Sequence, residues 1–340
     1  MAVSRWLGVC LLIMSAPTRA QPAPGLDQAR LQAAFERAAE LPRLQALIVA
    51  QDGVIAAERR FRGPRLDQPV NVKSISKSII SALVGIAIQR GQLSGVEQPI
   101  ANFFPAYVNA RSDPRLRQIN IGHLLTMQSG LVRTSGPGYA PWVRSRDWLR
   151  YILSAPLLAD PGGAMIYSTG NSHLLSAILT RATRQTTHAF ARDQLAKPLG
   201  IELPRWTRDP QGIFMGGNQM LLSAHALLRI GELYRNRGRH GERQVVPAEW
   251  IDASLTPRTR SIFSGQAYGY GWFIGRIGAH PLFYAWGHGG QFIFVLPDLR
   301  LTVVTTSVPD GPRDLDHLGA IYDLLLHEIV PSAEAAAERG

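Results

Sequence analysis

Two lysines lie on either side of Ser74 in the segment NVKSISKSII, residues 71–80. The chain has 36 Lys and Arg residues, of which only three are lysines: Lys73, Lys77 and Lys197. Arg keeps its proton in a protein, whereas a buried Lys can lose it. We therefore interpret the lysines beside Ser74 as a sign of proton transfer.

Ser74 and Lys77 are three residues apart, so on a helix they share a face. A helix that begins at Ser74 offers free N–H groups and partial positive charge to a developing negative oxygen. Burial would lower the pKa of Lys77 below its usual value of about 10.4, so that it could accept the serine proton. The alternative is an N-cap serine beside an exposed lysine. The apolar residues 79–88 disfavour it, because they predict a buried helix.

Tyr167, Ser168 and Thr169 follow a Gly-rich loop and precede an apolar helical pattern. A tyrosine on a loop beside a lysine can act as a general base or acid. The alternative is a packed tyrosine with one hydrogen bond.

The segment WGHGGQ, residues 286–291, leads into an apolar strand pattern. Gly289 and Gly290 would let a substrate or another backbone approach closely. The backbone N–H of Gln291, with that of Ser74, could form a two-donor oxyanion hole. His288 could hold a polar group or relay a proton; the alternative is a Gly-rich turn with a surface histidine.

The elements that must position these residues are strands at both ends of the chain and helices between them. Residues 26–40 have helical apolar spacing, and residues 44–61 read as a hairpin around a QDG turn. A buried helix at 74–90 ends at Gly91. Short aromatic and β-branched runs from residue 268 to 308 predict strands, and a last helix is expected at about 314–329.

This order predicts an α/β (α+β) fold with one antiparallel sheet built from the N- and C-terminal segments and flanked by helices. We expect a single catalytic unit at 21–340. Its discontinuous α/β region covers about 26–72 and 258–332, and a mostly helical region covers about 73–257. The site would lie in the groove between the two regions.

The first twenty residues combine Arg5, a short apolar run and a small-residue site at Ala20, which is typical of a secretory signal peptide cleaved after Ala20. The alternative, a membrane anchor, would need roughly twenty apolar residues instead of about eleven. Cys10, the only cysteine, lies in this segment, so the mature chain would have no disulfide, thiolate nucleophile or Cys-bound metal. We expect a periplasmic or secreted protein without stable membrane insertion.

The formal charge of +11 admits anionic partners, but the arginines are scattered. The densest cluster, residues 234–243, reads as a solvated Gly-rich turn, so we expect no nucleic-acid partner. The chain has no G-x-S-x-G elbow, no second histidine after His327-Glu328 for an H-E-x-x-H zinc site, and no nucleotide loop. Nothing in it calls for a metal or a cofactor.

Taken together, Ser74-x-x-Lys77, Tyr167-x-Thr169 and His288-Gly289-Gly290 resemble the ordered motifs of the serine β-lactamase-like and penicillin-binding-protein hydrolases. The similarity extends over nearly all of the chain after residue 20. The stretches YSTGN and WGHGGQFIFV are similar to the 6-aminohexanoate-dimer hydrolase-like branch.

The resemblance implies that Ser74 is the acylated nucleophile, Lys77 its proton partner and Tyr167 a general base or acid. It implies a backbone oxyanion hole at Ser74 and Gln291.

Further residues take the positions at which the resemblance implies substrate contacts: Thr169, Asn171, Gly289 and Gly290. The chain departs from the lactamases in having Thr169 at the third position of Y-x-N and His288 at the lysine of K-T-G. These replacements argue against efficient β-lactam hydrolysis.

We therefore expect an exported serine hydrolase that cleaves an ester or amide bond of a small molecule through an acyl-enzyme at Ser74. The alternatives are a β-lactamase or DD-peptidase and a non-catalytic envelope binding protein with the same fold. The loops at 134–142 and 209–218 are expected to shape the pocket. The sequence leaves the oligomeric state open.

Overall fold

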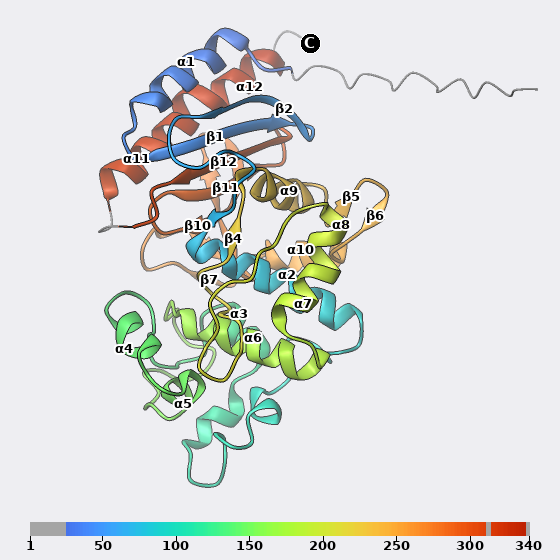
Figure 1. The fold of residues 1–340 in the computed structure, drawn as a ribbon, viewed down its shortest axis with the longest axis vertical. Helices are drawn as coiled ribbons and strands as arrows, with labels where there is room; N and C mark the ends of the chain where they lie inside the picture. Colours follow the sequence, from blue (N-terminus) through green and yellow to red (C-terminus); the bar gives the residue numbers. More distant parts are fainter. Residues whose placement is uncertain (1–24, 311–313, 338–340) are drawn as a thin grey trace, which may run out of the picture.

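The computed structural model describes residues 25–310 and 314–337. The signal-peptide prediction at 1–20 lies outside these residues. The described chain has a sheet layer with helices on it and a helical layer further along the long axis (Figure 1).

An eight-stranded antiparallel sheet is the frame of the molecule, with strand order β2-β1-β12-β11-β10-β9-β8-β7. The first two strands come from the N-terminal segment, and the other six come from the C-terminal segment. Their bounds are β1 Leu44–Gln51, β2 Val54–Arg60, β7 Thr259–Arg260, β8 Ala267–Tyr268, β9 Phe273–Ile277, β10 His280–Gly287, β11 Gln291–Leu296 and β12 Leu301–Ser307.

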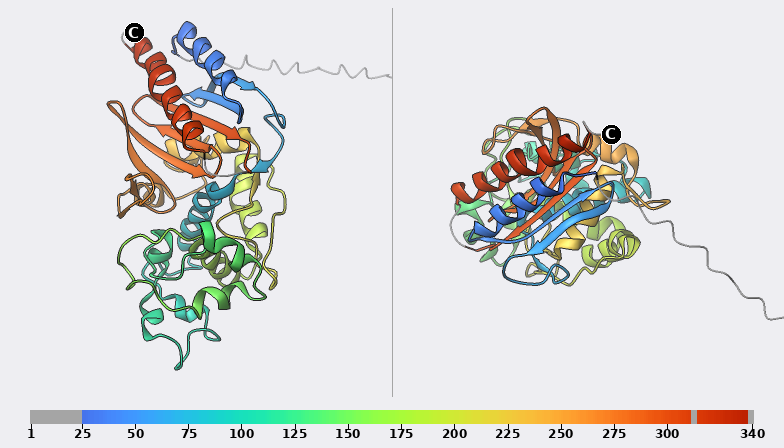
Figure 2. Two further views of the ribbon diagram at one scale, coloured as in Figure 1. Left: turned by 90° about the vertical axis from the view of Figure 1, so that its left-hand side faces the viewer. Right: turned by 90° about the horizontal axis from the view of Figure 1, so that it is seen from above.

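Helices cover both faces of this sheet, which explains why every residue of β11 and β12 is buried. On one face lie α1 (Gln28–Glu40), α11 (Leu315–Leu324) and α12 (Val330–Ala337), seen together in Figure 2. On the other face α9 (Ala224–Arg235) lies flush against β11 and β12. A Cβ on Gly231 of α9 would lie 2.6 Å from a Thr302 methyl group.

The remaining helices and short strands lie between residues 70 and 254. The α-helices are α2 Ser76–Gln89, α3 Ile121–Leu125, α4 Tyr139–Val143, α5 Trp148–Leu153, α6 Thr169–Thr183, α7 Thr187–Ala191, α8 Lys197–Leu199 and α10 Ala248–Ser254. The short strands are β3 Val70–Asn71, β4 Leu221–Leu222, β5 Arg239–His240 and β6 Arg243–Gln244.

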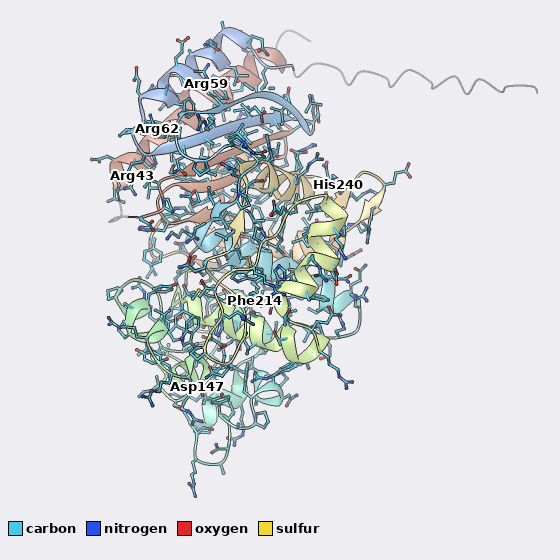
Figure 3. The ribbon with its side chains drawn as sticks, in the orientation of Figure 1. Arg43, Arg59, Arg62, Asp147, Phe214 and His240 are labelled. Atoms are coloured by element: carbon cyan, nitrogen blue, oxygen red, sulfur yellow. The ribbon has the colours of Figure 1, made fainter. Side chains whose placement is uncertain are left out.

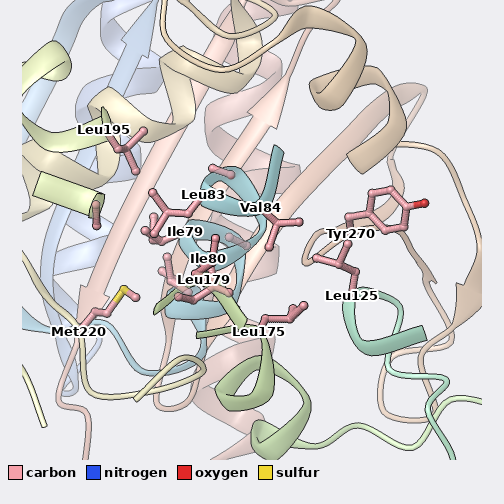
Figure 4. Packing of buried hydrophobic residues seen from close by; sticks show 14 of the residues in the cluster. Ile79, Ile80, Leu83, Val84, Leu125, Leu175, Leu179, Leu195, Met220 and Tyr270 are labelled. Carbon is pink, nitrogen blue, oxygen red and sulfur yellow. The ribbon is translucent and has the colours of Figure 1, made fainter. Parts of the chain in front are cut away.

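Helix α2 lies at the centre of the molecule, and all of its residues from 76 through 87 are buried. Figure 4 shows its side chains Ile79, Ile80, Leu83 and Val84 surrounded by apolar residues of other elements. A helix that is apolar on every side is stable only inside a core. Because α2 is packed on all sides, it is a rigid support for the residues at its N-terminus.

Arginines anchor the ends of elements near the sheet. The guanidinium of Arg62 donates to the carbonyls of Leu41 and Leu44, where α1 has ended and β1 begins. Arg43, Arg59 and Arg62 lie at the sheet end of the molecule, far from Asp147 in the helical layer (Figure 3).

The predicted fold class is confirmed: one antiparallel sheet is built from both ends of the chain and flanked by helices. The hairpin turns at Asp52-Gly53, and α2 is followed by Gly91 with φ 68°. The last helical segment extends beyond the expected Ile329, because a π-helical stretch (Leu325–Ile329) continues directly into α12. None of the helices in the described ranges has both the length and the apolar character to span a bilayer.

Candidate active site

Ser74 lies in a one-turn 3₁₀ helix, Lys73–Ile75, that leads directly into α2. The preceding residue, Lys73, has φ 51°, an uncommon conformation for a side chain other than glycine. The Asn71 side chain holds it by accepting a hydrogen bond from the Lys73 backbone N–H at 3.0 Å. The turn leaves the Ser74 N–H in the first helical turn, where N–H groups lack intrahelical partners.

The Lys77 ammonium lies below Ser74 and is almost completely enclosed, with 3% of the residue exposed. Its Nζ donates to Ser74 Oγ at 2.9 Å, to the Gly217 carbonyl at 2.7 Å and to Thr169 Oγ1 at 3.4 Å. Burial lowers the pKa of Lys77 to about 7, because the charged form loses its hydration. Lys77 can therefore both accept and release a proton near neutral pH.

Tyr167 lies against the same pair. The Lys77 Nζ is 4.9 Å from the centroid of its ring. Burial raises the pKa of Tyr167 to about 12, and a hydrogen bond with Ser74 opposes that rise. The phenol therefore keeps its proton at neutral pH, and Lys77 is the better resting base of the two.

A compact set of hydroxyl groups fixes the start of α6, which carries Thr169. Ser135 Oγ accepts from the Thr169 N–H and bonds to Thr169 Oγ1, both at 2.9 Å. Thr134 Oγ1 bonds to Ser168 Oγ at 2.9 Å and accepts from the Gly170 N–H at 2.7 Å. The loop that precedes α4 and the Tyr167 segment are thereby joined into one rigid wall.

The short β3–β4 pair positions the loop that carries Gly217 beside Ser74 and Lys77. Asn71 pairs with Leu221, and the Asn71 amide donates to Gln219 Oε1 at 2.6 Å. This pairing links the segment before Ser74 to the loop that carries Gly217. The residues that pair here are more than 140 positions apart in the sequence. No local sequence pattern could therefore have predicted the contact.

Ser74 opens into a pocket of about 500 Å³ between the sheet and the helical layer. Aromatic rings form much of its wall, and cationic side chains contribute to it. It is lined by Lys73, Ser74, Arg133, Ser135, Gly136, Tyr139, Tyr167, Thr169, Asn218, Gln219, Phe263, Phe273, Trp286 and His288. The loops at 134–142 and 209–218 contribute to this lining, as expected from the sequence.

Four of the predicted site residues therefore border the pocket: Ser74, Tyr167, Thr169 and His288. Lys77 lies under Ser74. Asn171 does not reach the pocket. It is fully buried in α6, where its amide oxygen accepts from Ser129 Oγ at 2.9 Å, so the prediction that it contacts substrate is wrong.

The substrate contact predicted for Gly289 and Gly290 is not supported, because neither lines the pocket, whereas the close approach of another backbone is seen. A Cβ on Gly289 would lie 2.7 Å from the Val308 carbonyl, and one on Gly290 would lie 2.8 Å from Ser307 Oγ. The close approach that these glycines permit is therefore to the end of β12 and not to a substrate.

Gln291 lies opposite Gly287 in the β10–β11 ladder and is fully buried, with its side chain bonded to the backbone of Ser307. Gln291 does not border the pocket, so the structure does not support the oxyanion-hole role predicted for its N–H. The Gly287 carbonyl accepts from the Gly290 N–H at 3.4 Å and thus points into the hairpin. Across a trans peptide the following N–H, that of His288, points the opposite way, towards the edge of β10 that β9 leaves unpaired beyond Tyr284.

That edge of β10 lies beside the helix that carries Ser74. A Cβ on Gly287 would stand 2.3 Å from the Val72 carbonyl, which leaves room there only for glycine. Ser74 and His288 both line the pocket beside this contact.

Sequence reasoning missed several lining residues, above all Arg133, Phe263, Phe273 and Trp286. Trp286 is two residues before His288. Residues two apart on a strand point to the same face, so this spacing could have indicated that Trp286 also faces the pocket. Phe263 and Arg133 lie in loops without a periodic pattern. In the described parts of the chain, no cluster of three or more His, Cys, Asp or Glu side chains is arranged to hold a metal ion.

Comparisons with known proteins agree with this geometry. A D-alanyl-D-alanine-carboxypeptidase/endopeptidase, AmpH, of Escherichia coli (strain K12) is 26% identical over 155 residues. The aligned part is 43% of this chain and only 39% of the length of that relative.

Two solved structures show the same fold. A protein described as a 6-aminohexanoate-dimer hydrolase from Bacillus anthracis has TM-score 0.71 and 16% identity, covering 91% of this chain and 82% of that chain. EstCE1, a hydrolase with promiscuous acyltransferase activity, has TM-score 0.72 and 18% identity, covering 88% of this chain and 98% of that chain. The Beta-lactamase family matches residues 31–327. This match takes in most of the chain, and the protein therefore belongs to the Beta-lactamase family, whose members are serine hydrolases.

Proposed function

We propose that this enzyme hydrolyses an ester or amide bond of a small molecule through an acyl-enzyme formed on Ser74. The observation that carries the proposal is the 2.9 Å contact between Ser74 Oγ and the buried Lys77 ammonium, whose pKa is about 7. Acyl transfer at neutral pH requires a nucleophile in contact with a base whose pKa lies near 7, so that the base is partly deprotonated and can accept the proton of the nucleophile.

In the proposed acylation, neutral Lys77 accepts the Ser74 proton as Ser74 Oγ bonds to the substrate carbonyl carbon. The N–H groups of Ser74 and His288 stabilise the resulting oxyanion, and one such donor is worth about 3 kcal/mol in comparable hydrolases. The leaving group departs with a proton supplied through Tyr167, which Lys77 replenishes.

In deacylation, a water molecule gives its proton to neutral Lys77 and attacks the ester carbon. The acid then leaves, and Ser74 Oγ takes this proton from the Lys77 ammonium. Dividing the reaction into two steps lowers the barrier of each.

The preference for esters and amides over β-lactams rests on the pocket residues. Trp286 lies at the end of β10, and His288 follows it at the position where β-lactam hydrolysis would favour Lys. Thr169 begins α6, at the position where β-lactam hydrolysis would favour Asn. The likeness of the fold to EstCE1 and to a protein described as a 6-aminohexanoate-dimer hydrolase supports this choice.

A DD-peptidase or β-lactamase activity is the second candidate, favoured by the partial match to a D-alanyl-D-alanine-carboxypeptidase/endopeptidase. Intact-mass spectrometry after incubation with p-nitrophenyl esters, short amides and penicillins distinguishes the candidates. We expect a Ser74-dependent acyl adduct or turnover with the esters. A stable penicillin adduct or nitrocefin turnover would favour the second candidate. Failure of a fluorophosphonate probe to label the protein would favour a non-catalytic binding protein.

We also propose that the enzyme is exported, on the basis of the signal-like pattern of residues 1–20. Fractionation of cells that express the full chain tests this proposal. We expect the protein in the periplasm or the medium with an N-terminus at Gln21; recovery of uncleaved chain in the cytoplasm would contradict it.

A further inference from the structure

The charges of the pocket wall are of one sign. Lys73 and Arg133 are among the lining residues, and no Asp or Glu is. Lys73 already has a counter-ion, because its Nζ lies 3.2 Å from the exposed Asp310 carboxylate. Arg133 has no carboxylate partner among the described residues. The pocket therefore contains a cation whose charge is not neutralised by the protein.

The Arg133 guanidinium is held in place by an aromatic ring instead of an anion. Its Cζ lies 5.3 Å from the centroid of the Phe263 ring. Phe263 in turn packs edge-on against Tyr167, with ring centroids 5.7 Å apart. Stacking leaves the hydrogen-bonding capacity of a guanidinium unused. Arg133 Nε is buried and has no hydrogen-bond acceptor among the described residues.

The backbone of Arg133 is also fixed relative to the reacting groups. The next two residues, Thr134 and Ser135, are hydrogen-bonded to Ser168 and Thr169. Thr169 Oγ1 is in turn 3.4 Å from Lys77 Nζ. A Cβ on Gly138 would lie 2.1 Å from the Arg133 carbonyl, so the loop closes tightly on itself. The backbone of Arg133 is thereby fixed relative to Lys77, and its side chain lines the same pocket as Ser74.

The guanidinium is only partly buried and lines the pocket, so an oxygen anion from a ligand could reach it and pair with its charge. The planar fork of Arg matches a carboxylate with two parallel hydrogen bonds. The rest of the wall carries Tyr139, Phe273 and Trp286 and suits an apolar or aromatic body. We propose that Arg133 is a specificity-determining residue that selects substrates with a carboxylate next to an apolar body. This inference rests on the proposed ester or amide hydrolysis.

Two pairs of p-nitrophenyl and phenyl esters test it. The acyl pair is p-nitrophenyl hydrogen glutarate against p-nitrophenyl butyrate, and the leaving-group pair is 4-carboxyphenyl butyrate against phenyl butyrate. For each pair, kcat/KM of the anionic ester is divided by that of the neutral ester. The pair with the higher ratio locates the carboxylate in the acyl or the leaving group.

In that pair, we expect the ratio to fall at least about tenfold in Arg133→Gln, as for a lost charge-assisted hydrogen bond, and to fall less in Arg133→Lys. Arg144→Gln is the matched control, since Arg144 is an exposed arginine of the neighbouring segment and does not line the pocket. The anionic-to-neutral ratio of kcat/KM in Arg144→Gln should equal that of the unmodified enzyme. An equal ratio in Arg133→Gln would overturn the inference and assign Arg133 a packing role.

A binding measurement separates this inference from the proposed function. Isothermal titration of the full chain with 4-phenylbutyrate and with neutral 4-phenylbutanamide needs no turnover. We expect the carboxylate to bind at least about tenfold more tightly, and Arg133→Gln to abolish the difference. If no ester is hydrolysed but this difference is found, only the proposed function fails. If esters are hydrolysed and both compounds bind equally, only this inference fails.

Discussion

Lys77 Nζ and Ser74 Oγ lie 2.9 Å apart, and the same ammonium donates to the Gly217 carbonyl at 2.7 Å. The first contact follows from a single helical turn. The second comes from a loop 140 residues away and helps to enclose the ammonium. Together they place a poorly hydrated amine against a hydroxyl group, and this relationship underlies the first four predictions below.

Replacing the nucleophile should abolish turnover without unfolding the protein. We expect Ser74→Ala to lose hydrolysis of p-nitrophenyl butyrate and labelling by a fluorophosphonate probe. Ser78→Ala is the matched control, because Ser78 lies one turn further along α2 and its hydroxyl donates to the Gly271 carbonyl. It should lower stability by about 1 kcal/mol and still form the acyl-enzyme. Undiminished labelling of Ser74→Ala would assign the chemistry to another residue.

Lys77→Arg keeps the positive charge but removes the ability to give up a proton. We expect kcat/KM for the ester to fall at least about a hundredfold, as for loss of a general base. Circular dichroism should show an unchanged fold. Near-normal rates in Lys77→Arg would rule out the base role of Lys77.

The pH dependence of acylation should report Lys77. Its pKa of about 7 means that the neutral amine predominates above that pH, so the rate should rise with pH and level off above about 8. Tyr167, with a pKa of about 12, should add no further rise below pH 11. Stopped-flow measurement of the p-nitrophenol burst from pH 5 to 10 checks this. A rate still climbing at pH 10 would point to Tyr167 as the resting base.

Lys77 should also destabilise the fold in a pH-dependent way. Its pKa is 10.5 when unfolded and about 7 when folded, so the unfolded chain binds more protons between these values. The free energy of unfolding therefore rises with pH from 7 to 10.5, and the penalty, on the order of 5 kcal/mol, is complete only below pH 7.

Denaturation of Lys77→Met in urea, compared with the unmodified protein, measures this penalty. The stability advantage of the variant should be largest near pH 6 and should shrink as the pH approaches 10. A difference that is constant over this range would show that burial does not shift the pKa of Lys77.

Gly287 should tolerate no side chain. An added Cβ would stand 2.3 Å from the Val72 carbonyl and push β10 away from the helix that carries Ser74. We expect Gly287→Ala to lose about 1–3 kcal/mol of stability and most of the ester hydrolysis. Gly319→Ala in α11 is the control, since its Cβ would meet nothing within 4 Å. It should leave the activity unchanged and raise the stability by about 0.5–1 kcal/mol, as expected for Gly→Ala inside a helix. Full activity in Gly287→Ala would show that this contact does not contribute to the oxyanion hole.

The sequence by itself determined what depends on neighbours along the chain. Period-two and helical apolar patterns predicted the β1–β2 hairpin, α1, α2 and strands β9 to β12. The three-residue spacing of Ser74 and Lys77 predicted their contact, because one helical turn brings such residues together. The apolar run after Lys77 correctly indicated that α2 is buried.

Only the tertiary structure decided which groups surround that pair. The Gly217 carbonyl, Arg133 and Phe263 come from loops without periodicity, and their positions depend on pairings between distant segments such as Asn71 with Leu221.

Asn171 and Gln291 were misplaced for a related reason. Each lies within a few residues of the pocket along the chain, but rotation along a helix or alternation along a strand turns it into the core. Sequence proximity establishes which segment approaches a site. The direction of each side chain and N–H group is set by packing, which becomes definite only when the whole chain has folded.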